Sequence, residues 1–79
     1  MSDRERIRAY LARFNSDEEW LSSDDIFATG VVDSMIALEL VIFLEKTFGI
    51  TIEEDDLQIE NLCSVNGMLG MLERKRAMT

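Results

Sequence analysis

The chain contains no histidine and no proline, and it has a single cysteine among its 79 residues. Without histidine, it cannot build a Ser-His or Cys-His pair, a histidine general base or a histidine-rich metal site. Without proline, its loops must be closed by Gly, Asn, Ser and Asp. The lone cysteine, Cys63, excludes an internal disulfide and favours a reducing compartment. Its expected role is that of a small core or boundary residue.

Basic side chains are scarce as well, since eight Lys and Arg stand against sixteen Asp and Glu, for a formal net charge of −8. This balance argues against binding a nucleic-acid backbone, which needs a basic face, and favours partners that present Lys and Arg. The longest apolar run is broken by Glu39 and Glu45, so no membrane-spanning helix is predicted. The polar stretch from Met1 to Arg8 shows no cleavable signal pattern. We therefore expect a soluble, cytoplasmic protein.

The length predicts one domain, residues 1–79, with a thin core. Hydrophobic residues make up 47%, too many for a disordered chain. Apolar spacing predicts four helices, over residues 2–14, 35–48, 57–62 and 65–75. Ser2 and Glu5 have the spacing of a capping box for the first helix. Gly49 is placed to end the second helix and Ser64 to cap the fourth.

The long connection over residues 15–33 is not predicted to be a flexible linker. Its large apolar side chains should pack on the core, and they are Trp20, Leu21, Ile26 and Phe27. The run of Ser and Asp at residues 22–25 predicts one short helical turn there.

The helix predicted over residues 35–48 is apolar on more than one side. One stripe should face the core and comprises Leu40, Val41, Leu44 and Phe48. A second apolar set falls largely outside that stripe, with Glu39 and Glu45 interleaved; it comprises Met35, Ile36, Leu38, Ile42 and Phe43. Because so small a domain cannot bury a helix on every side, the second set predicts an interaction surface.

The stretch Gly30-Val31-Val32-Asp33-Ser34-Met35 leads into this helix and contains an Asp-Ser pair, both of which are capping residue types. Ser34 is therefore expected at an exposed helix start, where the dipole favours a phosphate. No base is available to activate its hydroxyl, since the chain lacks histidine and Lys46 lies about 18 Å further along the helix. Ser34 is predicted to be an attachment point modified by another enzyme, or only a cap.

Most of the net negative charge lies between Asp33 and Glu60. The run from Glu53 to Asp56 predicts a solvated loop at a helix start. It lacks the alternating ligands, central Gly and closing Glu of a calcium loop. Between Asp33 and Glu60 there are eight acids and one base, Lys46. Such a charge speeds the encounter with basic partners more than it adds affinity.

Three stretches together resemble the signature of acyl carrier proteins, the phosphopantetheine-binding carrier family. They are Gly30-Val31-Val32-Asp33-Ser34-Met35, Leu38-Glu39-Leu40-Val41 and Glu45-Lys46-Thr47-Phe48-Gly49-Ile50. The likeness extends from Ile7 to Leu72 and includes the Ser-Val start of the last helix. It implies an all-α four-helix carrier bundle with a short third helix and a long loop between the first two. It also implies a motif of Gly30, Asp33, Ser34 and Met35, in which Ser34 carries covalent 4′-phosphopantetheine.

The resemblance further implies that the chain is not an enzyme. The arm would come from coenzyme A through a phosphopantetheinyl transferase that uses magnesium, and its thiol would hold an acyl group as a thioester. Other implied partners are an acyl-loading enzyme and a ketosynthase, acyltransferase or dehydrogenase, with no nucleic acid, no membrane and a monomeric state. The expected docking residues are Met35, Ile36, Leu38, Glu39, Ile42, Phe43 and Glu45.

Several features depart from the commonest fatty-acid carriers: Met35 after the serine, apolar Ile36 and Phe43, and a longer segment over residues 48–65. With the Glu60-Asn61-Leu62 stretch, they resemble discrete carriers of polyketide or hybrid polyketide–nonribosomal peptide pathways, some of which hold malonyl-type extender units. Two alternatives remain open. One is an aminoacyl carrier of the D-alanyl or peptidyl kind, and the other is an acidic helical adaptor that carries no arm.

Overall fold

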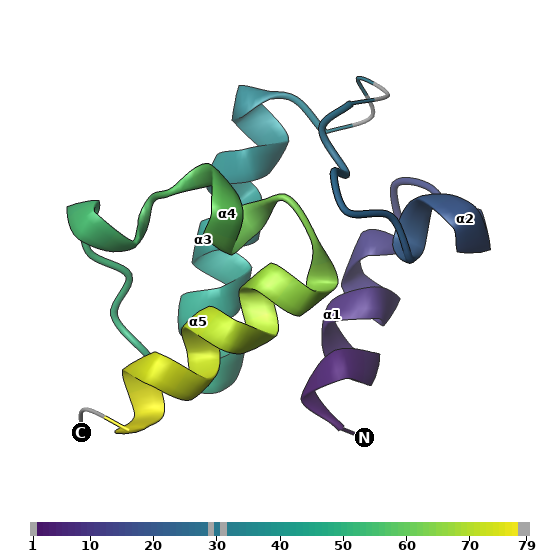
Figure 1. The fold of residues 1–79 in the computed structure, drawn as a ribbon. Coiled ribbons are helices and arrows are strands. Elements are labelled where there is room, and N and C mark those ends of the chain that lie inside the picture. The colour runs from purple at the N-terminus through teal and green to yellow at the C-terminus, as the bar shows by residue number, and fades with distance from the viewer. Residues whose placement is uncertain (1, 29, 31, 78–79) are drawn as a thin grey trace.

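The computed structural model describes residues 2–28, 30 and 32–77, and this part of the chain is helical, with no strand. The helices are α1 (Asp3–Leu11), α2 (Glu18–Leu21), α3 (Ser34–Phe48), α4 (Ile59–Leu62) and α5 (Val65–Ala77), and a 3₁₀ turn, η1 (Glu54–Asp56), precedes α4. The predicted all-α bundle is confirmed, and α4 is the short helix predicted as the third (Figure 1). Helix α2 adds one turn within the long connection. No described helix is long and apolar enough to cross a membrane.

Helix α1 begins where the sequence predicts and ends earlier, at Leu11 rather than Phe14. The capping box is present: Ser2 Oγ accepts from the Glu5 N–H at 3.2 Å, and the Glu5 carboxylate accepts from the Ser2 N–H at 3.3 Å. The helix ends early because the N–H groups of Arg13 and Phe14 donate to carbonyls three residues back, which tightens the chain into a turn.

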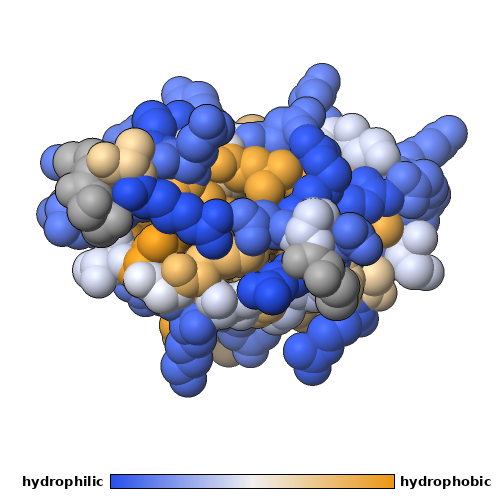
Figure 2. All heavy atoms as spheres, turned by 90° about the horizontal axis from the view of Figure 1, so that it is seen from below, coloured by the Kyte–Doolittle hydropathy of each residue, from blue (hydrophilic) through white to orange (hydrophobic). Residues whose placement is uncertain are grey.

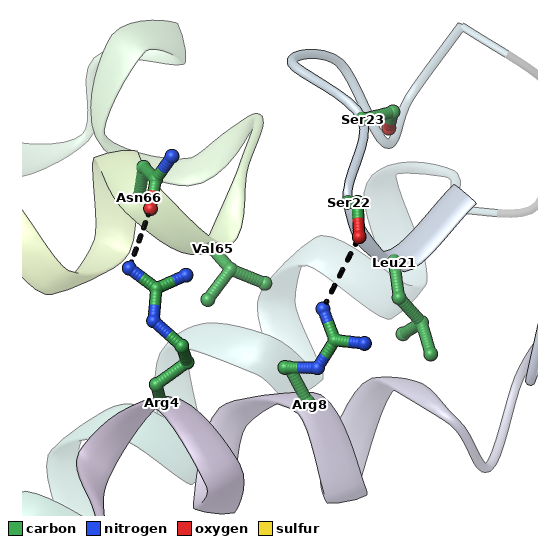
Figure 3. A pocket seen from close by; sticks show the side chains of 7 residues that line it. All are labelled: Arg4, Arg8, Leu21, Ser22, Ser23, Val65 and Asn66. Carbon is green, nitrogen blue, oxygen red and sulfur yellow. Dashed lines mark hydrogen bonds between the residues drawn. The ribbon is translucent and has the colours of Figure 1, made fainter. Parts of the chain in front are cut away.

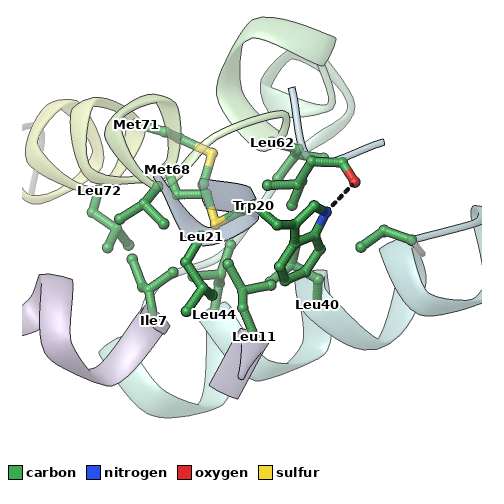
Figure 4. Close-up of a cluster of buried hydrophobic side chains, with 13 residues drawn as sticks. Ile7, Leu11, Trp20, Leu21, Leu40, Leu44, Leu62, Met68, Met71 and Leu72 are labelled. Carbon is green, nitrogen blue, oxygen red and sulfur yellow. Dashed lines mark hydrogen bonds between the residues drawn. The ribbon is translucent and has the colours of Figure 1, made fainter. Parts of the chain in front are cut away.

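The connection between α1 and α3 packs on the core, as its apolar residues predict. Trp20, Leu21 and Ile26 are buried, and the Trp20 indole N–H donates to the Ile26 carbonyl at 3.1 Å (Figure 4). The Ile26 N–H in turn donates to the Cys63 carbonyl at 2.7 Å. Cys63 is half-buried, as expected of a boundary residue. These bonds fix the connection against the junction between α4 and α5.

The helical turn in this connection lies at Glu18–Leu21, so its prediction at residues 22–25 was wrong. Asp17 provides the cap, because its carboxylate accepts from the Glu19 N–H at 3.2 Å. A turn that starts at Asp17 directs Trp20 into the core.

Helix α3 supplies the centre of the core. Leu40 and Leu44 are fully buried (Figure 4). Val41 and Phe48 are half-buried against the same cluster, so the predicted inward stripe is confirmed. Gly49 ends the helix in the left-handed region, with φ of +65°, and its N–H donates to a carbonyl of the last turn.

The segment after α3 returns to the core before α4 begins. Ile50 and Ile52 are half-buried and pack against the core. Helix α4 starts at Ile59 rather than at Leu57, because the η1 turn comes first and the chain is extended again at residue 58. Both Leu57 and Ile59 remain exposed.

Helix α5 packs against α1 and α4. Ser64 caps it, since Ser64 Oγ accepts from the Gly67 N–H at 2.9 Å. Its fully or nearly buried side chains are Val65, Met68, Met71 and Leu72, with Leu69 half-buried at the edge of the stripe. The end of the molecule that carries both termini shows hydrophobic residues between hydrophilic ones (Figure 2). At this end the Arg76 guanidinium bonds the Asp3 carboxylate at 2.5 Å.

Candidate functional site

The start of α3 is capped by Asp33 and not by Ser34. One carboxylate oxygen of Asp33 accepts from the Met35 N–H at 3.1 Å and from the Ile36 N–H at 3.0 Å. Asp33 is in an extended conformation, with φ of −106° and ψ of −173°, whereas Ser34 is already the first helical residue. The alternative in which Ser34 serves as the cap is therefore wrong.

Ser34 is exposed, and its hydroxyl has no hydrogen-bond partner within the described part of the chain. The residues before it explain this position. Val32 is buried in the core cluster, and Gly30 turns the chain with φ of +77°. Val31 lies outside the described residues. Val32 is buried and Asp33 caps the helix, so Ser34 is left exposed. The start of α3 lies at the end of the molecule opposite both termini (Figure 1).

The surroundings of Ser34 suit attachment of a phosphate ester better than catalysis. An exposed, unbonded hydroxyl is accessible to another protein's active site. The two N–H groups that would hold a phosphate at this helix end already donate to Asp33. A phosphate on Ser34 would therefore stay in solvent beside the Asp33 carboxylate. The described residues contain no cluster of His, Cys, Asp or Glu suited to a metal ion.

Three apolar side chains extend from Ser34 along the outer face of α3. Met35, Leu38 and Ile42 are 74%, 66% and 50% exposed. Their spacing places them on one side of the helix, with the exposed Glu39 beside them. Side chains of this size and exposure are typical of a contact surface for another protein.

Ile36 and Phe43 do not belong to this outer face, so their prediction outside the core stripe was wrong. Both are half-buried and pack against the core. The Phe43 ring stacks on Tyr10 of α1, with centroids 4.1 Å apart and planes 11° apart, and meets Phe48 edge-on at 6.2 Å. The physical reason is angular: Ile36 and Phe43 lie within about a quarter turn of the buried Leu40 side of α3.

The predicted acidic docking residues have different surroundings. Glu39 is exposed. Burial of Tyr10 raises the pKa of its hydroxyl, and the negative charge of Glu39 raises it further. Glu45 is half-buried, and its carboxylate accepts from the Ile52 N–H at 2.9 Å. Glu45 thus fixes the segment after α3, a role that its spacing in the sequence did not indicate.

One member of the acidic run is also structural. The Asp56 carboxylate bonds the Lys75 ammonium at 2.6 Å and accepts from the Glu53 N–H at 3.0 Å. The Lys75 bond, followed by the bond from the Glu53 N–H, lowers the pKa of Asp56, and the same ion pair raises the pKa of Lys75. Glu54 and Asp55 are exposed beside it. The run is therefore only partly available to steer a partner.

Comparison with known proteins points to one family. Residues 5–72 match the family model described as the phosphopantetheine attachment site. Over 65 residues, 81% of this chain, the sequence is 34% identical to the non-reducing polyketide synthase stbA of Stachybotrys bisbyi, of which the match covers 3%. It is 32% identical, again over 65 residues, to the D-alanyl carrier protein of Streptococcus suis (strain 05ZYH33), with 82% of that protein covered. No solved structure gave a significant match.

Proposed function

Because this chain belongs to the phosphopantetheine-binding carrier family, whose members carry 4′-phosphopantetheine covalently on a serine, we propose that Ser34 is the serine that carries it. The observation that supports this assignment is the exposed, unbonded hydroxyl at the start of α3. Four other serines of the described chain are engaged, because their hydroxyls bond Glu5, Glu18, the Trp20 carbonyl and the Gly67 N–H.

Ser16 is the matched control for this assignment. Its side chain is exposed and has no hydrogen-bond partner within the described residues, as for Ser34. It lies between α1 and α2, next to Asp17, and no exposed apolar helix face follows it. Accessibility alone therefore does not select Ser34; the Asp33 cap and the apolar face behind it favour recognition at this site.

The test is the intact mass of the protein after incubation with coenzyme A, magnesium and a phosphopantetheinyl transferase of broad range. Wild type and Ser16→Ala should each gain the mass of one arm, and Ser34→Ala should gain none. An arm that persists in Ser34→Ala would disprove the assignment. An unmodified wild type would favour the acidic adaptor instead.

The proposed role is that of a carrier and not of an enzyme. The arm would supply a terminal thiol that holds a cargo as a thioester. The chain itself places the arm in solvent and presents a contact surface. Ser34 has no neighbouring base to make it a nucleophile, because histidine is absent and Lys46 lies about 18 Å along the helix.

The outer face of α3 is the proposed docking surface for the transferase and for the enzymes that load and use the cargo. Met35, Leu38 and Ile42 supply apolar area, and Glu39 supplies charge. The exposed acids near α4 extend this charge. A partner with a basic rim around an apolar groove fits both features, so the rate of arm transfer should fall as salt screens the charges.

For the cargo, we propose an acyl group in polyketide or hybrid polyketide–peptide synthesis, with a malonyl-type unit as one form. In this role, the partners would include an acyl-loading enzyme and a ketosynthase, acyltransferase or dehydrogenase. The similarity to a polyketide synthase supports it, although the chain spans only 3% of that relative. The 82% coverage of the D-alanyl carrier protein favours an aminoacyl cargo as the second candidate. The mass of the thioester on protein from its native host distinguishes the two.

A further inference from the structure

A pocket of about 140 Å³ lies between α1, the end of α2 and the start of α5, away from the residues assigned to the carrier site. Arg4 and Arg8 project into it from successive turns of α1, and the opposite side is formed by Ser22, Ser23 and Asn66 (Figure 3). Both arginines lie off the buried side of α1, and their guanidinium groups share one concave space.

The pocket has more positive charge than its neighbours neutralise. Arg8 pairs with Glu18, and its other terminal nitrogen donates to Ser22 Oγ at 3.5 Å. Arg4 donates to the neutral Asn66 side chain at 2.7 Å and has no ion pair among the described residues. Two guanidinium groups therefore share one carboxylate, on a molecule whose net charge is −8. Each guanidinium has five N–H donors, so donors remain for a ligand.

The two serine hydroxyls of the pocket already donate to other groups. Ser22 Oγ donates to Glu18 at 3.3 Å, and Ser23 Oγ donates to the Trp20 carbonyl at 2.8 Å. Recognition should therefore come chiefly from the two guanidinium groups, whose planar donor pairs match the oxygens of a phosphate. The volume is well below the roughly 300 Å³ at which pockets for drug-sized organic ligands begin.

We propose that this pocket binds one phosphate group, either as the free ion or as a phosphate monoester. Glu18 competes with the ligand for Arg8, so binding should be weak and should strengthen when Glu18 is neutralised. The site is separate from Ser34, and it does not depend on the carrier function proposed above.

The test is an NMR titration of the isotope-labelled full chain with inorganic phosphate, which records the backbone amide chemical shifts. Ionic strength is held constant with chloride as the balancing ion. The shifts should saturate and should be largest around Arg4, Arg8, Ser22 and Asn66. Arg4→Gln and Arg8→Gln should each weaken binding by about ten-fold, the expected loss for a charge-assisted hydrogen bond. Glu18→Gln should strengthen it.

Arg6→Gln is the matched control, because it removes the same charge from the same helix. Arg6 lines a different groove, beside Tyr10 and Phe43, and binding should change by less than about two-fold. Equal loss in Arg6→Gln and Arg4→Gln, or shifts that never saturate, would overturn the proposal in favour of general charge screening. Circular dichroism of each variant confirms that it is folded.

Phosphoserine as a second probe separates the two sources of the group. Binding of both phosphate and phosphoserine supports a pocket that accepts a phosphate borne by a larger molecule. Binding of inorganic phosphate alone supports a free-ion site. Binding of neither overturns the proposal.

Discussion

At the scale of single residues, Asp33 and Ser34 divide two tasks between neighbouring side chains. Asp33 bonds two N–H groups of α3, while the Ser34 hydroxyl is unbonded within the described chain. Asp33→Ala should therefore cost about 1 kcal/mol in the free energy of unfolding, the usual loss of a helix cap. Ser34→Ala should change that free energy by less than about 0.5 kcal/mol. Urea denaturation of both variants measures the difference.

The reverse result would contradict this division. If Ser34→Ala proved the more destabilising change, the hydroxyl would be a cap and its assignment as an attachment point would lose its structural support. Asp33→Asn provides an additional check, because asparagine also caps helices. It should retain most of the stability and should isolate any effect of the charge on arm transfer.

The Asp-Ser pair also shows what the sequence predicts at this scale. Both residues carry an oxygen that can accept from a helix N–H, so their types predict the helix start but not which of them caps it. Backbone conformation decides this, because Asp33 is extended and Ser34 is helical. The position of the candidate site was thus predictable, whereas its hydrogen bonds required the structure.

At the scale of elements, the two sides of α3 separate core packing from the proposed docking surface. Phe43 stacks on Tyr10 of α1, whereas Leu38 is 66% exposed. Phe43→Ala should lower the free energy of unfolding by about 2 kcal/mol, less than for a fully buried ring. Leu38→Ala should change it by less than about 0.5 kcal/mol and should slow arm transfer from coenzyme A. Denaturation and transfer rates on both variants test the separation.

Equal transfer rates for Leu38→Ala and the wild type would exclude Leu38 from the docking surface. A Phe43→Ala variant that melts like the wild type would show that the stack with Tyr10 contributes little. Apolar spacing placed Phe43 outside the core stripe because periodicity predicts where a stripe is centred, not how wide it is. The width depends on α1, which lies beside that edge of α3.

The two glycines of α5 differ in what their neighbours allow. A Cβ on Gly67 would lie 2.2 Å from the Glu60 carbonyl oxygen of α4, while one on Gly70 would meet only the Arg74 side chain at 3.5 Å. Gly67→Ala should force the helices apart and cost about 1–3 kcal/mol. Gly70→Ala should be neutral or stabilising by up to about 1 kcal/mol, the difference in helix propensity. Melting temperatures of the pair test this, and equal values would contradict the close contact.

Element boundaries were predicted less well than the elements themselves. All four main helices follow from apolar spacing, because their inward faces must be buried. Helix α4 starts late because η1 precedes it, and α2 starts at Glu18 because Asp17 caps it. The start of each helix depends on which of several similar polar residues bonds the backbone. For α2, the packing of Trp20 in the core decides it.

At the scale of the whole molecule, the ion pair of Asp56 and Lys75 joins the segment before α4 to the end of α5. Arg74 supports the same contact, since it donates to the Asn61 side chain at 2.6 Å, and Asn61 donates to the Asp56 carbonyl at 2.8 Å. Within the described residues, Asp56 is the one among the eight acids between Asp33 and Glu60 that forms an ion pair.

The same pair predicts how stability depends on pH. The folded state lowers the pKa of Asp56, so its contribution is present above about pH 4 and disappears as the pH falls through the lowered pKa. The folded state raises the pKa of Lys75, so its contribution is present below about pH 10.4 and disappears as the pH rises through the raised value. Between these limits, Asp56→Asn should have a constant, lower urea midpoint than the wild type.

The difference between Asp56→Asn and the wild type should shrink in acid, because protonation removes the same charge that the substitution removes. Urea midpoints measured from pH 3 to pH 9 (roughly the range set by these two groups) provide the test. Asp55→Asn, at an exposed neighbour with no ion pair in the described chain, is the control and should stay close to the wild type throughout. A gap between Asp56→Asn and the wild type that stays constant down to the lowest pH would show that packing, and not the ion pair, joins this segment to α5.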